Sequence, residues 1–67
     1  MNKKMDIGDI RVALECNDEA NSYNVTVTGE GRQLERLEYP GDRDTAMTEY
    51  TMICGLLKKV AAIHKLI

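Results

Sequence analysis

Residues 44–66 read DTAMTEYTMICGLLKKVAAIHKL, and this stretch decides the fold. Its apolar positions recur at steps of three and four residues, which is the period of one face of an α-helix. That stripe consists of Ala46, Tyr50, Ile53, Leu57 and Val60. Asp44 or Thr45 can cap the first turn, because each offers a side-chain oxygen to a free backbone amide. The sequence therefore predicts one long helix near residues 44–66.

Two runs ahead of the helix alternate between apolar and polar residues, as half-buried β-strands do. The first lies near residues 8–16, and its apolar face consists of Ile10, Val12, Leu14 and Cys16. The second lies near residues 23–29 and turns Tyr23, Val25 and Val27 to one side. Gly29-Glu30-Gly31 then supplies a short glycine-containing hairpin loop.

A third strand, near residues 32–39, is less regular. Leu34 is out of phase with Leu37 and Tyr39, so we expect a β-bulge or a late strand start near Leu34. Pro40 ends the strand, because proline cannot donate a hydrogen bond to the ladder.

These elements predict an α+β domain with a three-stranded antiparallel sheet. The order is β-β-β-α, and the long C-terminal helix covers the hydrophobic face of the sheet. A chain of 67 residues is expected to form a single domain, 1–67, with a small core. Residues 1–7 are expected to be flexible.

Composition restricts the class of protein. Hydrophobic residues make up 43% of the chain and charged residues 30%, which is typical of a folded domain. The first ten residues contain no apolar stretch that could serve as a signal peptide or membrane anchor. We therefore expect a cytoplasmic protein with no membrane partner. In that reducing compartment, Cys16 and Cys54 are expected to be free, buried thiols.

No set of residues has the pattern of a catalytic or cofactor site. Cys16, Cys54 and His64 lack the close paired spacing of structural zinc ligands. Neither cysteine is expected in the electropositive setting that activates a thiol. The glycines of residues 29–31 lack the strand-to-helix context of a phosphate-binding loop. The sequence therefore predicts a protein that is not an enzyme and has no cofactor and no metal.

Acidic residues dominate the chain ahead of the helix. From Asp6 to Glu49 there are eleven acids and four arginines, whereas residues 50–67 carry three lysines and no acid. We assign an acidic surface to Glu30, Glu35, Glu38, Asp42 and Asp44. Acids near the helix start would repel phosphates, so we predict no direct nucleic-acid binding and a protein partner with a basic surface. The helix dipole alone also favours this charge order.

The C-terminal half of the helix is apolar around more than one stripe. A second set, joined by Ala62, consists of Met52, Gly55, Leu56, Ile63 and Leu66. The small residues Gly55 and Ala62 would let another helix approach closely. We predict a homodimer, or an equivalent partner interface, centred on Met52, Leu56 and Ile63. The alternative is a set of scattered exposed apolar residues, which are ordinary on small proteins.

The order of elements resembles that of a known family. Three antiparallel strands and then a helix with an early glutamate, Thr45-Ala46-Met47-Thr48-Glu49, resemble the first half of the ribonuclease H fold. In that family a strand carboxylate and the helix glutamate hold magnesium. The resemblance implies that Glu15 and Glu49 are metal ligands of a nuclease remnant that works as a dimer. Glu49 can also be explained as a residue at the helix boundary that reaches solvent.

The small truncated version of that fold in HicB-like antitoxins is also similar. This likeness rests on Tyr39-Pro40-Gly41 and on Asp44-Thr45 ahead of the helix. It implies partner binding without hydrolysis. The leading hypothesis is therefore a small non-enzymatic protein-binding module, acting as a prokaryotic or phage regulator or inhibitor. The metal-dependent nuclease remnant is the alternative.

Overall fold

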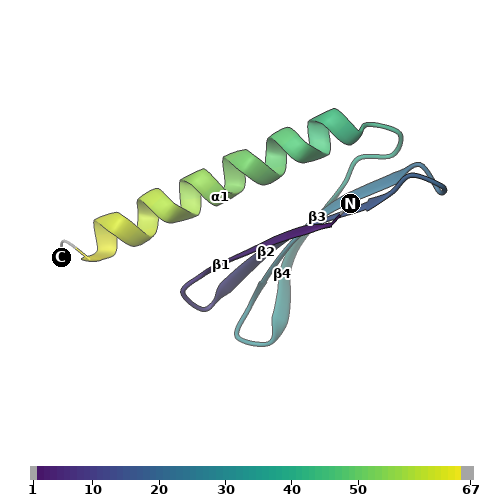
Figure 1. The fold of residues 1–67 in the computed structure, drawn as a ribbon. Coiled ribbons are helices and arrows are strands. Elements are labelled where there is room, and N and C mark those ends of the chain that lie inside the picture. The colour runs from purple at the N-terminus through teal and green to yellow at the C-terminus, as the bar shows by residue number, and fades with distance from the viewer. Residues whose placement is uncertain (1, 66–67) are drawn as a thin grey trace.

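The computed structural model describes residues 2–65, which form one antiparallel sheet and one helix (Figure 1). The elements are β1 (Lys3–Ile7), β2 (Ile10–Asn17), β3 (Ser22–Gly29), β4 (Arg32–Glu38) and α1 (Arg43–Lys65). Each strand pairs with the next along the chain, so the sheet order is β1-β2-β3-β4. The predicted α+β class, with an antiparallel sheet and a C-terminal helix, is confirmed. The predicted strand number is wrong, because the sheet has four strands.

The additional strand is β1, within residues 1–7 that were predicted to be flexible. It pairs with β2 from Lys3 opposite Leu14 to Ile7 opposite Ile10. Its signal in the sequence is weak, because Met5 and Ile7 are its only apolar residues. Gly8, with φ of 61°, occupies the first central position of the two-residue turn, where a type II′ turn needs a positive φ. This hairpin and the pairing with β2 order residues 3–7.

The β-bulge expected near Leu34 is present. Val27 pairs with Glu35 and Thr28 pairs with Gln33, so Leu34 is an extra residue on β4. An inserted residue breaks the alternation of a strand, which explains why Leu34 is out of phase with the apolar residues that follow it.

The core lies between the sheet and the first half of α1. The buried hydrophobic residues are Val12, Leu14, Tyr23, Val25, Ala46, Tyr50 and Cys54. They include inward positions predicted for β2 and β3 and two members of the predicted helical stripe. The prediction that Val60 belongs to the buried stripe is wrong. Its side chain is 48% exposed, and the packing of the helix against the core extends only as far as Leu57. The last turns of α1, drawn in yellow, extend past the hairpin ends of the sheet (Figure 1).

The helix begins one residue earlier than predicted, and its cap is Asp42 rather than Asp44 or Thr45. One carboxylate oxygen of Asp42 accepts a hydrogen bond from the Thr45 backbone N–H at 3.0 Å. The other accepts one from the Thr45 hydroxyl at 2.6 Å. These bonds favour the charged form and hold the pKa of the Asp42 carboxyl below its ordinary value. The predicted end near residue 66 lies outside the described residues.

The cap makes the stability of the domain depend on pH. A lowered pKa in the folded state means that the contribution of Asp42 is fully present above 3.8, the ordinary value. It is lost as the pH falls through the lowered folded value. We expect Asp42→Ala to reduce the melting temperature by several degrees at pH 7, with a smaller reduction at pH 3.

Asp42→Asn is the matched control, because asparagine also caps helices but does not titrate. It should keep most of the stability at pH 7. Thermal unfolding followed by circular dichroism at both pH values gives the comparison. Equal melting temperatures for Asp42→Ala and the wild type at pH 7 would show that this cap contributes nothing.

Candidate functional site

Five large apolar side chains are about half exposed in the part of the chain that the structure describes. They are Leu34 at 53%, Met52 at 55%, Leu56 at 61%, Val60 at 48% and Ile63 at 59%. The last four lie on consecutive turns of α1 and are called the helix flank below. A contiguous exposed apolar patch is uncommon on a monomer and marks an interaction surface more often than single exposed leucines do.

The geometry of the helix places the flank on one side of α1. At 3.6 residues per turn, the four residues fall within about 80° of the circumference. Glu49 lies in the same sector, about one turn before Met52. Burial raises the pKa of the Tyr39 hydroxyl, and the nearby Glu49 carboxylate raises it further. Because Tyr39 directly follows β4, the Glu49 side of α1 lies toward the β4 edge of the sheet at this end of the helix.

The fifth exposed apolar side chain, Leu34, lies on the sheet. The helix packs mainly across β1, β2 and β3, so β4 lies beside it. Leu34 of β4 lies close to Gly29, where an added Cβ would stand 3.0 Å from Leu34 Cδ1. A hollow of about 340 Å³ opens there, lined by Ile7, Asp9, Ile10, Gly29, Glu30, Arg32 and Leu34. This sheet hollow and the helix flank are the two least covered apolar areas of residues 2–65.

The predicted interface residues are divided between two sides of the helix. Met52, Leu56 and Ile63 belong to the helix flank. Gly55 is half-buried and lies about 100° around the helix from Leu56. No atom of another part of the chain lies within 4 Å of where its Cβ would be, so packing inside the chain does not require a glycine. Leu66 lies outside the described residues. The role of these residues as an interface stays a prediction.

The predicted acidic residues are all exposed, and most of them lie on β4 or directly beside it in the sequence. Glu30 is in the turn before the strand, Glu35 and Glu38 are on it, and Asp42 follows it. Asp44 is in the first turn of α1. The surface is not purely negative, because Arg36 Nε donates a hydrogen bond to Glu38 at 3.1 Å. Glu35 pairs with Val27 on the core side of the sheet and Glu38 pairs with Asn24 on the outer side, so these two carboxylates lie on opposite faces of β4.

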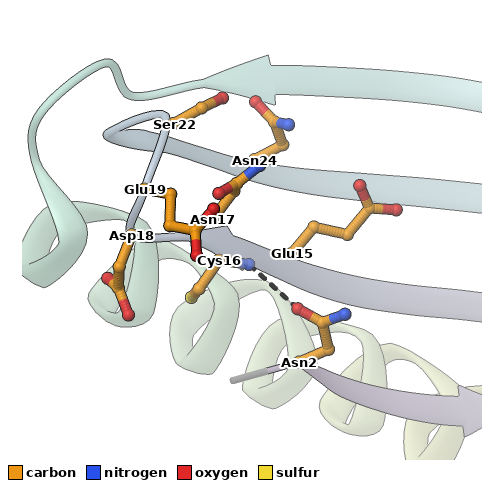
Figure 2. Close-up of a pocket in the computed structure, with 8 residues that line it drawn as sticks. All are labelled: Asn2, Glu15, Cys16, Asn17, Asp18, Glu19, Ser22 and Asn24. Carbon is orange, nitrogen blue, oxygen red and sulfur yellow. Dashed lines mark hydrogen bonds between the residues drawn. The ribbon is translucent and has the colours of Figure 1, made fainter.

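A second, polar hollow lies beside the β2–β3 loop (Figure 2). It measures about 590 Å³ and is lined by Asn2, Glu15, Cys16, Asn17, Asp18, Glu19, Ser22 and Asn24. The Cys16 backbone N–H donates a hydrogen bond to the Asn2 side chain at 3.0 Å. Beside it, the Tyr23 hydroxyl donates to Asp18 at 2.8 Å. These bonds hold the end of β1 and the loop in place, and we assign no chemistry to the hollow.

The structure does not bring Glu15 and Glu49 together. Figure 2 shows Glu15 and Cys16 pointing to opposite sides of β2, and Cys16 is the one that packs toward the core. Glu49 belongs to the helix, which covers the core side of the sheet. Within residues 2–65 there is also no group of three His, Cys, Asp or Glu side chains that could hold a metal ion. This arrangement does not fit a magnesium site that Glu15 and Glu49 share within one chain.

The other chemically reactive side chains are also apart. Both cysteines are free, as expected, but only Cys54 is buried and Cys16 is half-buried. His64 is exposed near the end of α1.

No family model matches the sequence, and comparisons with curated proteins and with solved structures find no match. The resemblance to the ribonuclease H fold and to HicB-like antitoxins therefore stays a prediction. The helix of the described region is not long and apolar enough to cross a membrane.

Calorimetric titration with Mg²⁺ or Mn²⁺ tests the nuclease alternative. We expect no binding heat at millimolar metal concentration, because the sheet separates Glu15 from Glu49 in each chain. Asp44→Ala serves as the control for a nonspecific loss of negative charge. Heat that disappears in Glu49→Ala and persists in Asp44→Ala would contradict this expectation and support a site assembled between two chains.

Proposed function

We propose that this protein is a small non-enzymatic protein-binding module whose contact surface is the helix flank. One observation carries the proposal: Met52, Leu56, Val60 and Ile63 are each about half exposed and form a single stripe on α1. Burying the exposed half of such a side chain against a partner stabilises the complex by about 1 kcal/mol. Four of them in one stripe therefore provide a substantial driving force for association.

The charges beside the flank favour a partner with a basic rim. Glu35 is exposed on the face of β4 that is turned toward the helix side of the sheet, and Glu30 is exposed in the turn before that strand. Complementary charges at the edge of an interface mainly raise the association rate and exclude wrong partners. The resemblance to HicB-like antitoxins agrees with this proposal. On that ground we assign the module to the regulators or inhibitors of prokaryotes or phages.

Affinity capture with matched variants tests the contact surface. Wild type, Leu56→Glu and Ala62→Glu are immobilised and exposed to a lysate of the source cell. Both substitutions put a glutamate at an exposed position of α1. Ala62, which the sequence suggested as a small residue for helix approach, lies about 120° around the helix from Leu56 and outside the helix flank. We expect a partner that is retained by the wild type and by Ala62→Glu and is lost by Leu56→Glu.

The captured partner must then bind the purified chain directly, with an affinity that decreases as the salt concentration rises. Screening acts on exposed charges over a Debye length of about 8 Å at physiological ionic strength, so the charged rim should account for this decrease. If the three immobilised proteins retain the same set of partners, the helix flank is not the contact surface and the proposal fails.

A further inference from the structure

The spacing of the apolar residues on the flank side of α1 is that of a helix-pairing seam. Ile53, Leu56, Val60 and Ile63 follow one another at steps of three, four and three residues. Apolar residues that alternate between these steps form the seam along which two α-helices pack together. Ile53 is half-buried at the edge of the core, and the next three residues are about half exposed. The seam therefore begins in the core and continues beyond it.

One helix is too narrow for this sheet. Four strands about 4.8 Å apart span about 14 Å between the outer strand axes, whereas a helix with its side chains is about 10 Å across. In this fold α1 packs over β1, β2 and β3 and leaves Leu34 of β4 more than half exposed. A second helix placed against the flank would lie on the β4 side, next to the part of the sheet that α1 does not cover.

The accessible surface area of the chain is larger than that of a typical folded monomer of the same mass. Its accessible surface is 4897 Å². A folded monomer of 7.5 kDa exposes about 4250 Å², so the excess is about 650 Å². A stable interface of standard size buries about 800 Å² on each partner. The excess area is thus close to what one contact surface of a dimer would bury.

The dipole and the charges of α1 favour a second α1 that runs in the opposite direction over one that runs parallel. The cap and first two turns carry three carboxylates and one arginine, namely Asp42, Asp44, Glu49 and Arg43. The second half carries three lysines and no acid, namely Lys58, Lys59 and Lys65. Around a midpoint near residue 58, antiparallel pairing opposes the two helix dipoles and keeps the acidic first turns of the two copies far apart, whereas parallel pairing aligns the dipoles and sets like charges side by side along the whole helix.

We infer that the occupant of the helix flank is α1 of a second copy of this chain, packed antiparallel along the seam. The inference rests on the proposed function and identifies the partner of the same surface. The seam has its midpoint near Lys58, so Leu56 of each copy lies opposite Val60 of the other, and Ile53 lies opposite Ile63. A twofold dimer of this kind is isologous, with the same surface contributed by both copies.

Sedimentation equilibrium of the purified chain tests the occupant. At tens of micromolar, the wild type and Ala62→Glu are expected at twice the chain mass of 7.5 kDa. Leu56→Glu is expected at the monomer mass, with a dissociation constant raised by more than about 100-fold because its charge would be buried without a partner. Circular dichroism establishes that each variant is folded. A wild type that stays monomeric at millimolar concentration, or a Leu56→Glu variant that still dimerises, overturns the inference.

Spin labels test the direction of the pair. Thr48 and Ala62 are exposed on neighbouring sides of α1, away from the seam. Each is replaced by a labelled cysteine in a background with Cys16→Ser and Cys54→Ala. Around a midpoint near residue 58, at 1.5 Å per residue, the two copies of label 48 lie about 30 Å apart along the axis and those of label 62 about 12 Å. Equal, short distances for both labels would mean a parallel pair and overturn the inference.

These outcomes separate the inference from the proposed function. Sedimentation uses the purified chain alone, whereas affinity capture uses other proteins. If the chain is monomeric but captures a partner that Leu56→Glu loses, the flank is a protein-binding surface for a different occupant and only the self-association is wrong. If neither assay depends on Leu56, both proposals fail.

Discussion

The mismatch in width between one helix and a four-stranded sheet shapes the rest of this molecule. The helix buries Val12, Leu14 and Val25 under its first half, whereas β4 adds the half-buried Leu37 to the packing and leaves Leu34 exposed. The hydrophobic core is consequently small and displaced toward β1, β2 and β3. The side of the helix that faces β4 is left with large apolar residues that the sheet does not cover. The apolar surface is thus a direct consequence of the number of strands.

The two halves of α1 therefore have different physical roles. Ala46, Tyr50 and Cys54 in the first half belong to the core and stabilise the domain. In the second half, Leu56, Val60 and Ile63 stay half exposed and become stabilising only when a partner covers them. A domain of this size buries only about 60% of its unfolded surface and has a small margin of stability. A partner that binds only the folded state would raise that margin, so the proposed association would couple folding to binding.

Local patterns in the sequence predicted the elements better than they predicted which surfaces are covered. Alternation found β2 and β3, and the phase of Leu34 found the bulge in β4. It missed β1, although Gly8 at the tip of a two-residue turn was a usable signal. The helical period assigned Val60 to the buried stripe, because periodicity gives the direction of a side chain but not how far the sheet extends beneath it. For the same reason, the sequence could name Leu56 and Ile63 but could not give their exposure.

The simple order of the sheet also has a kinetic consequence. Every strand pairs with its neighbour in the sequence, so each of the three hairpins closes only a short loop. No strand pair requires a segment that is distant in the sequence. Folding rates rise as the mean sequence separation of contacting residues falls, which makes this meander a fast sheet to form. The helix comes after all four strands, so a nascent chain can assemble its sheet before the apolar half of α1 has been synthesised.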